Sequence, residues 1–256
     1  QGDTKMTIIK DSVQRFTDLP TVSPNGYVVE IKGDDDTNFD NYYVKFVTNN
    51  GGALEEGQWE ETVKDGIKFK FNYDTMPHVL IRQADGNFRF ARVDGDSYNV
   101  TVGSNTQSYT LPQWGERMVG DEESAPDPSF IGNKINNVFF FRNRLGFLAD
   151  DNVILSRVSE FFNFFPETVI TVIDSDPIDV AASHTKVAIL KNAVSMGEQL
   201  ILFSDQTQFV LASSSDTLTP QTANVIVATE FESSAKAAPV GSGLSLIHIS
   251  EPTRPS

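Results

Sequence analysis

The residue types that do chemistry are sparse in this chain of 256 residues. It has no cysteine, and its only histidines outside the final segment are His78 and His184. A zinc site takes about four ligands, mostly imidazole or thiolate, so we predict hydrogen-bonded structural histidines and no metal. Ser183 precedes His184, but neighbours on a strand point to opposite faces, and no Gly-x-Ser-x-Gly elbow exposes a nucleophile. We therefore predict no catalytic residue.

Acidic residues are plentiful, but their spacing suits neither glycoside hydrolysis nor a calcium site. Three pairs of glutamates are sequence neighbours: Glu55-Glu56, Glu60-Glu61 and Glu122-Glu123. Glycoside hydrolysis instead needs two carboxyl groups that face each other across a sugar, roughly 5 to 10 Å apart. The run Asp34–Asp36 with Asn38 and Asp40 offers oxygen ligands to Ca²⁺ but lacks the central glycine and distant glutamate of an EF-hand. We expect solvated loop charge at these places, and no cofactor.

Three arginines interrupt apolar runs in a chain whose formal charge is −15: Arg142, Arg144 and Arg157. They can pair with carboxylates of their own unit, such as Asp150 or Glu160, with a neighbouring subunit, or with DNA phosphate. We expect the first of these arrangements, because it satisfies the charge locally.

Two further clusters have a structural interpretation. Asp174, Asp176 and Asp179 surround Pro177, and we predict a turn whose side chains cap backbone N–H groups. The aromatic run Phe161–Phe165, interrupted by Asn163, carries more apolar surface than one hairpin covers. It forms either core or an interface, and we favour the core.

These residues must be positioned mainly by β structure. Short runs of Val, Ile and Phe alternate with Gly, Pro, Asn and Asp, which is typical of strands. We predict a short helix over residues 5–16, ended before Pro20. We predict one hairpin from the strands 27–31 and 42–47, followed by two single strands at 57–63 and 67–71. We predict a second hairpin from the strands 78–82 and 87–92, whose turn contains Asp85-Gly86.

The second half of the chain contains a repeat. Leu145–Asp150 resembles Leu200–Asp205 at an offset of 55 residues, and strand-like runs at 138–141 and 193–195 precede the two copies. A repeat of this length made of short antiparallel strands is expected of propeller blades, with chance similarity between hairpins as the alternative. The polar stretch 115–129 is typical of a linker. We therefore predict a β-rich N-terminal region, residues 1–125, followed by part of a β-propeller-like domain, residues 126–243.

The sequence resembles a known family, the tail tubular or nozzle proteins of T7-like short-tailed bacteriophages. The resemblance covers about residues 8–240, with segments such as Phe139–Phe147, Asn152–Arg157 and Asp174–Val180 in the same order. The positions that carry it are Trp59, Met76, Pro77, Trp114, Arg142, Asn143, Arg144, Ser156, Arg157, Phe161, Asn163, Phe164, Asp174, Asp176, Pro177 and Asp205.

The resemblance implies a structural virion protein and not an enzyme. It implies a six-fold ring of identical subunits at the distal end of the tail, in contact with the upper tail tube or adaptor and with tail fibres, assembled in the host bacterial cytoplasm. DNA would pass through this channel without sequence-specific binding, as expected of an acidic chain. The alternatives are a glycan-binding or glycan-degrading module at the tail tip, and an adaptor that docks tail fibres.

The ends of the chain prompt two more expectations. Members of the family are longer, so the chain is interpreted as an internal fragment. Residues 244–256 resemble the translation of a sequencing-library adaptor and are predicted not to be natural sequence, the alternative being a genuine strand at Leu246–Ile249. No apolar stretch approaches the roughly 20 residues that span a bilayer, and we predict no membrane insertion for this fragment.

Overall fold

The computed structural model describes residues 11–33, 41–183, 188–215, 217–233, 239–242 and 245–247, and these are almost entirely strands and loops. This confirms the prediction of a mainly β fold. The elements are β1 Ser12–Val13, a 3₁₀ turn Phe16–Asp18, β2 Val22–Pro24, β3 Val28–Ile31, β4 Tyr42–Thr48, β5 Leu54–Thr62, β6 Val79–Arg82, β7 Phe88–Ala91, β8 Ser97–Val102, β9 Asn105–Thr110, β10 Ile135–Phe141, β11 Arg144–Ala149, β12 Asn152–Leu155, β13 Ile178–Ala181, β14 Asn192–Met196, β15 Gln199–Phe203, β16 Gln208–Ser213, β17 Ala223–Thr229, β18 Val240–Ser242 and β19 Ser245–Ile247.

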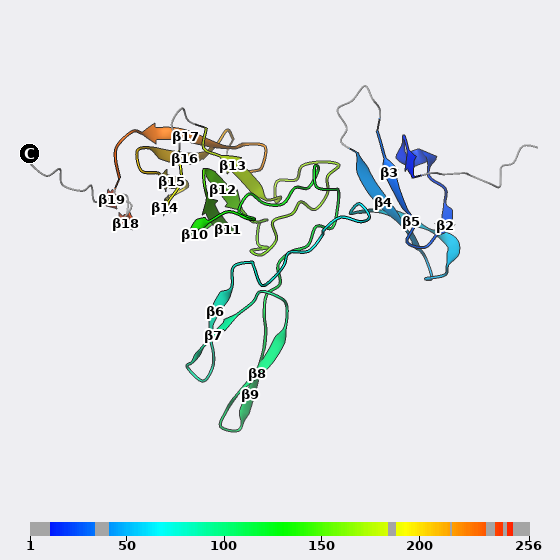
Figure 1. Ribbon diagram of the computed structural model, residues 1–256, viewed down its shortest axis with the longest axis horizontal. Coiled ribbons are helices and arrows are strands. Elements are labelled where there is room, and N and C mark those ends of the chain that lie inside the picture. The colour runs from blue at the N-terminus through cyan, green and yellow to red at the C-terminus, as the bar shows by residue number, and fades with distance from the viewer. Residues whose placement is uncertain are drawn as a thin grey trace, which may run out of the picture.

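The N-terminal sheet has the order β1-β3-β4-β5-β2 and lies at one end of the molecule (Figure 1). The predicted β3–β4 hairpin is confirmed, whereas its acidic connection, residues 34–40, lies outside the described residues. The helix predicted at 5–16 is wrong where it can be compared, because Ser12–Val13 pair in parallel with β3. Val13 packs against the buried Val29, Ile31, Tyr42 and Val44, and this tertiary contact outweighs the local preference for helix.

Strand β5 corrects the interpretation of the glutamate pairs at 55–56 and 60–61. Both pairs lie on this strand and not in loops, and its alternating exposure sends the two members of each pair to opposite faces. The strand predicted at 67–71 is wrong. Those residues form bends and coil, and the carbonyl of Phe69 accepts a hydrogen bond from the backbone N–H of Arg117 at 2.8 Å.

Two hairpins project side by side from the rest of the molecule (Figure 1). The predicted one, β6–β7, is confirmed. Its turn places Gly86 at φ +85°, a conformation that glycine adopts without steric cost. The second hairpin, β8–β9, was not predicted from the sequence.

The repeat is confirmed as two four-stranded antiparallel sheets, β10-β11-β12-β13 and β14-β15-β16-β17. One register row of the first sheet runs through Phe139, Gly146, Leu155 and Ile178. Phe139, Leu155 and Ile178 belong to the apolar cluster that also contains residues of the second sheet. The row at equivalent positions of the second sheet is Val194, Ile201, Val210 and Ile226. That row lies outside the shared core and is partly exposed. The two sheets therefore stack in the same sense, as successive propeller blades do.

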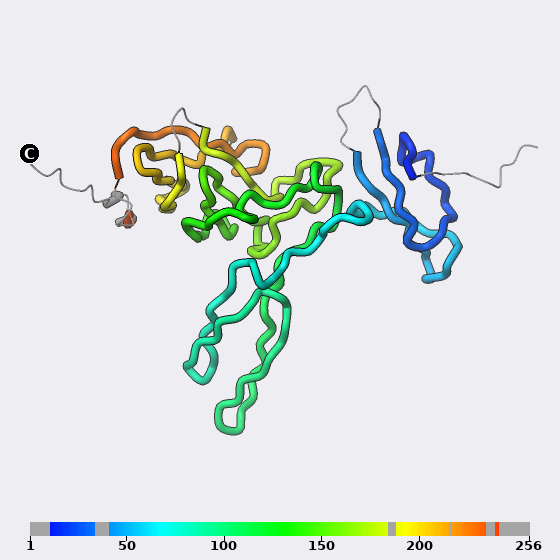
Figure 2. The backbone as a smooth tube through the Cα atoms, in the orientation of Figure 1, coloured from blue at the N-terminus to red at the C-terminus, as the bar shows by residue number. Residues whose placement is uncertain are grey.

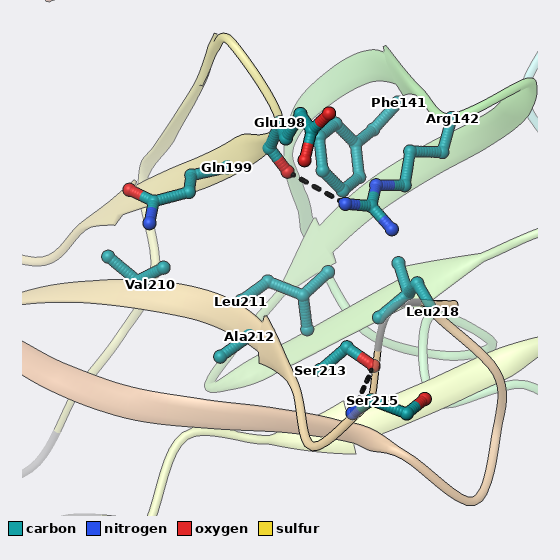
Figure 3. Close-up of a pocket in the computed structure, with 10 residues that line it drawn as sticks. All are labelled: Phe141, Arg142, Glu198, Gln199, Val210, Leu211, Ala212, Ser213, Ser215 and Leu218. Carbon is teal, nitrogen blue, oxygen red and sulfur yellow. Dashed lines mark hydrogen bonds between the residues drawn. The ribbon is translucent and has the colours of Figure 1, made fainter.

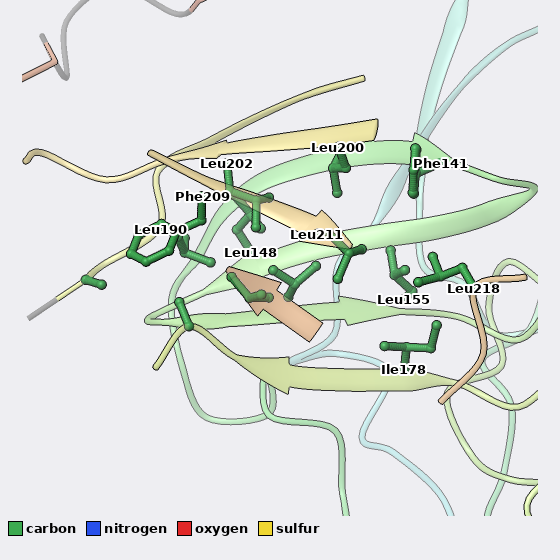
Figure 4. Close-up of a cluster of buried hydrophobic side chains, with 14 residues drawn as sticks. Phe141, Leu148, Leu155, Ile178, Leu190, Leu200, Leu202, Phe209, Leu211 and Leu218 are labelled. Atoms are coloured by element: carbon green, nitrogen blue, oxygen red, sulfur yellow. The ribbon is translucent and has the colours of Figure 1, made fainter. Parts of the chain in front are cut away.

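Two apolar clusters hold this half together. The first lies between the sheets and contains Leu148, Leu155, Leu200 and Phe209, all fully buried (Figure 4). The second covers the other face of the first sheet and combines residues from both sides of position 125, among them Met76, Trp114, Phe147 and Phe164. The stretch 115–129 has no strand but is closely packed at Arg117, Val119 and Ala125. The domain boundary near residue 125 stays a prediction.

Within the described ranges, no helix has the length and apolar character needed to cross a membrane.

Candidate functional site

We call the sixteen positions that carry the family resemblance the signature residues. The most deeply buried charged residue among them is Arg144, at the start of β11, with 1% of its surface exposed. Its Nη1 donates to the carbonyls of Ser156 at 2.7 Å and Asp176 at 2.6 Å, and its Nη2 donates to the carbonyl of Asp174 at 2.8 Å. Burial lowers the pKa of Arg144 to about 10, with a further lowering by Arg157 that Asp176 opposes. The guanidinium remains charged at neutral pH and ties the 174–176 turn to β11.

Asp176 supports the same turn from within. Its carboxylate accepts the backbone N–H groups of Glu167 at 3.1 Å and Ile173 at 3.0 Å. These contacts confirm the predicted capping role for Asp176. Asp179 acts in a similar way, because it accepts the backbone N–H of Ser129 at 2.8 Å.

Arg157 is paired within its own unit, as predicted. Its guanidinium contacts Glu160 at 2.9 Å and also Glu167, and its Nε lies 3.9 Å from Asp176. The other predicted partner, Asp150, is not among these contacts. Arg144 differs from the expectation, since it is satisfied mainly by backbone carbonyls and not by a carboxylate.

Polar side chains fix the loops around these arginines. Ser156 is fully buried, and its Oγ accepts the N–H of Leu145 at 3.0 Å and donates to the carbonyl of Arg157 at 2.9 Å. Asn143, at φ +59°, donates to Ser159 Oγ at 2.6 Å. Asn163 donates to Glu160 at 2.8 Å and accepts the N–H of Phe165 at 3.1 Å. Together with Arg144, Arg157 and Asp176, these residues form what we term the arginine centre.

Arg142 lies apart from the arginine centre, on the exposed tip of the β10–β11 hairpin at φ +46°. Its Nη2 donates to the carbonyl of Glu198 at 3.2 Å, on one side of a hollow of about 530 Å³ between the two blade-like sheets (Figure 3). Ser213 and Ser215 line the opposite side of this hollow. Of the three arginines, Arg142 is therefore the one whose guanidinium faces solvent.

The aromatic signature residues build the second cluster. Trp114 is 2% exposed and lies 5.3 Å from the ring of Phe162 and 6.1 Å from that of Phe164. Met76 is buried in the same cluster, and Pro77 lines a neighbouring hollow. The preference for a core role is confirmed for Phe164 and Phe165, whereas Phe161 is half-buried and packs edge-on against the exposed Phe140 at 5.4 Å.

Three further signature residues lie outside the arginine centre and the aromatic cluster. Trp59 belongs to the N-terminal sheet, where its Nε1 donates to the carbonyl of Pro20 at 2.9 Å and its ring meets Phe46. Asp205 pairs with Lys191 at 2.5 Å on the surface of the second blade-like sheet. Pro177 follows Asp176 and lines a hollow beside β13. The structure thus distributes the sixteen positions over several packing units, and their status as a family signature stays a prediction.

Among the described residues, those considered for catalysis or metal binding do not meet in one site. His78 is a structural histidine, as predicted, with Nδ1 2.8 Å from the carbonyl of Met76 and its ring stacked on Phe90. His184 and the acidic run at 34–40 lie outside the described residues. In the part of the chain that the structure describes, no three His, Cys, Asp or Glu side chains group as metal ligands. The acidic hollow lined by Glu30, Asp121 and Glu123 contains the buried Tyr43 and no exposed aromatic platform.

One structural arginine was missed by the sequence analysis. Arg117 is 2% exposed, donates from Nε to the carbonyl of Ala125 at 2.7 Å, and pairs with Asp127 at 2.9 Å. It also donates to the carbonyl of Lys68. Nothing in the local sequence distinguishes it from a solvated charge in a polar stretch, since its partners come from coil segments.

Glu61 connects the N-terminal sheet to the region of the arginine centre. Its carboxylate accepts the hydroxyl of Thr168 at 2.5 Å and the backbone N–H of Val169 at 2.8 Å. Val169 in turn packs on the core of that sheet. Glu61 therefore orders a segment that lies more than a hundred residues further along the chain.

Replacing Glu61 with alanine will lower the free energy of unfolding by about 1 to 3 kcal/mol, because the N–H of Val169 loses its charged acceptor. Glu60→Ala is the matched control, since Glu60 is exposed on the opposite face of β5, and it will change stability by about 0.5 kcal/mol or less. Urea unfolding of both variants measures the difference. Equal losses in the two variants would show that the contact to Val169 contributes nothing.

The fold and the arginine centre define a β-rich structural protein, in which the buried arginines Arg144 and Arg157 hold loops against the first blade-like sheet. The model of the bacteriophage nozzle protein family matches residues 1–254, and the chain belongs to that family. It is also similar to the tail tubular protein gp12 of Escherichia phage T7, with 41% identity over 230 residues. That alignment covers 90% of this chain and 26% of the relative, so the chain spans about a quarter of the length of that protein.

Proposed function

We propose that the chain is part of the wall of a phage tail tube, a structural component that acts by self-association and not by catalytic turnover. The observation that carries this proposal is the 41% identity to a tail tubular protein over nearly the whole chain. The use of the buried arginines supports it. Arg144 and Arg117 donate to backbone carbonyls, so these charges stabilise a scaffold and are not presented to a substrate.

The assembled form we propose is a six-fold ring that surrounds the channel through which DNA leaves the virion. A head-to-tail contact that closes on itself produces such a ring from identical subunits. The chain carries a formal charge of −15, and an acidic channel wall would reduce the retention of DNA as it passes. The partners we propose are the upper tail tube or adaptor and the tail fibres, with assembly in the host cytoplasm.

The experiment that tests this function is mass spectrometry of purified virions of the phage that encodes the chain. We expect peptides from residues 11–233 in stoichiometry with other tail proteins, and rings in electron micrographs of the purified protein. Absence of these peptides from intact virions would contradict the structural role. A ring whose bore is lined by Lys and Arg would contradict the acidic channel while leaving the structural role in place.

A further inference from the structure

Two Asn-Gly pairs occur in the chain, and both lie in connections of the N-terminal sheet. Asn25-Gly26 lies between β2 and β3, and Asn50-Gly51 lies between β4 and β5, at one end of the sheet (Figure 2). The two connections touch, since the backbone N–H of Asn25 donates to the carbonyl of Ala53 at 3.1 Å. In an Asn-Gly pair the side-chain amide is open to attack by the next backbone nitrogen, because glycine has no side chain to obstruct the approach.

Exposure and backbone conformation do not distinguish the two pairs. All four residues are exposed. Gly26 and Gly51 both have φ +79°, and a methyl group placed on either would meet no described atom within 4 Å apart from its chain neighbours. Any difference in the reactivity of Asn25 and Asn50 must therefore come from their hydrogen bonds.

The hydrogen bonds of the first pair hold the attacking nitrogen away from the amide. The backbone N–H of Gly26 donates to the carbonyl of Phe46 at 2.8 Å. The side-chain oxygen of Asn25 accepts the backbone N–H of Thr48 at 3.3 Å. Both reacting groups of this pair are thus bonded to β4, and they can meet only if those bonds break.

The second pair lacks this restraint. Within the described ranges, the backbone N–H of Gly51 donates to no acceptor. Asn50 is held from its nitrogen atoms only, because its backbone N–H and its Nδ2 donate to the carboxylate of Glu55 at 3.1 and 3.3 Å. The nitrogen that would attack is therefore free in the folded protein.

We propose that Asn50 is a site of spontaneous covalent modification, at which the folded protein converts asparagine to aspartate and isoaspartate, whereas the fold protects Asn25. This inference is independent of the proposed role in the tail.

The reaction needs only water as a co-reactant. The backbone nitrogen of Gly51 attacks Cγ of Asn50, so that a C–N bond forms and the bond from Cγ to Nδ2 breaks. The Gly51 nitrogen loses its proton, and Nδ2 gains one and leaves as ammonia, which produces a succinimide ring. Water then adds to either ring carbonyl and opens the ring, giving aspartate or an isoaspartate whose backbone runs through the side chain. No atom is oxidised or reduced.

The modification changes the turn that contains it. Hydrogen bonds from the backbone of Gly52 and the side chain of Asn50 lower the pKa of Glu55, so this carboxylate is charged at neutral pH. Either product replaces the amide of Asn50 by a second carboxylate. The hydrogen bond to Glu55 is then lost and two like charges repel each other, which loosens the connection between β4 and β5.

Peptide mapping of the intact protein tests the proposal, because trypsin places Asn25 in peptide 16–32 and Asn50 in peptide 46–64. The folded protein is incubated in mildly alkaline buffer, and mass spectrometry follows the deamidated fraction of each peptide. We expect peptide 46–64 to deamidate at least about tenfold faster, because Asn25 reacts only after a local opening that costs free energy. In concentrated urea we expect the two rates to become similar.

Two outcomes would overturn the proposal. One is equal or faster deamidation of peptide 16–32 in the folded protein. The other is a folded protein in which neither peptide reacts although both react in urea, which would show that the turn at Asn50 is protected as well. Neither outcome bears on whether the protein is found in virions, so the proposed function is tested separately.

A pair of variants assigns the reaction to one residue. Asn50→Gln will abolish most of the deamidation of peptide 46–64, because the longer side chain must form a six-membered ring, which closes much more slowly. Asn49→Gln is the matched control, since Asn49 is exposed in the same turn but is followed by asparagine and not by glycine, and it will leave the rate unchanged. Loss of the reaction in Asn49→Gln alone would show that Asn50 is not the site. Labelling by an isoaspartyl methyltransferase identifies the isoaspartate product.

Discussion

Replacing Arg144 with methionine will lower the free energy of unfolding by about 3 to 5 kcal/mol. The guanidinium is 1% exposed and is the donor for the carbonyls of Ser156, Asp174 and Asp176. Methionine fills a similar volume but donates no hydrogen bond, so these buried carbonyls lose their partner. We expect the 174–176 turn to detach from β11 and the loops of the arginine centre to loosen with it.

Urea unfolding followed by circular dichroism measures this loss. Arg142→Met is the matched control, because Arg142 is two residues away but exposed, and its guanidinium donates to the carbonyl of Glu198 at 3.2 Å. It will change stability by about 0.5 kcal/mol or less. If both substitutions had the same small effect, the carbonyls would be satisfied without Arg144, and the role given to the arginine centre would be wrong.

The parts of the fold that could be predicted from the sequence are those with local, repeated signals. The offset between Leu145–Asp150 and Leu200–Asp205 identified the two blade-like sheets because each strand buries alternate residues in a shared core. The β6–β7 hairpin was predictable because Asp85-Gly86 separates two apolar runs at the spacing of a tight turn. The family resemblance located most of the arginine centre, but it did not show which atoms the arginines contact.

The parts that could not be predicted depend on partners distant in sequence. Residues 67–71 alternate as a strand does, yet they pair with no strand in the described part of the chain. The carbonyls of Lys68 and Phe69 instead accept hydrogen bonds from Arg117. The β8–β9 hairpin is exposed on most of its residues, so it lacks the apolar and polar alternation that marks a half-buried strand. Arg144 was expected to find a carboxylate, because a sequence shows side chains but not the backbone carbonyls that a fold brings together.

Replacing Trp114 with alanine will lower the free energy of unfolding by about 3 to 5 kcal/mol, the usual range for removing a large aromatic side chain from a core. Trp114 contacts Phe130, Phe147, Phe162 and Phe164, and it is 2% exposed. Its Nε1 finds no hydrogen-bond partner in the described part of the chain. Trp114→Phe will therefore cost only about 1 kcal/mol, because it removes ring volume but breaks no hydrogen bond.

The chain has two tryptophans, so each Trp114 variant leaves Trp59 as the fluorescent reporter in the N-terminal sheet, while far-ultraviolet circular dichroism follows all sheets. The cluster around Trp114 joins Met76 and Val93 to Leu145 and Phe147, across the boundary predicted near residue 125. If Trp114→Ala shifts both signals in one transition, the segments on either side of residue 125 fold as a single unit. If Trp59 keeps its wild-type midpoint while the circular dichroism transition moves, the N-terminal sheet is an independent unit, and the stabilising effect of Trp114 is confined to the base of the two projecting hairpins and the blade-like sheets.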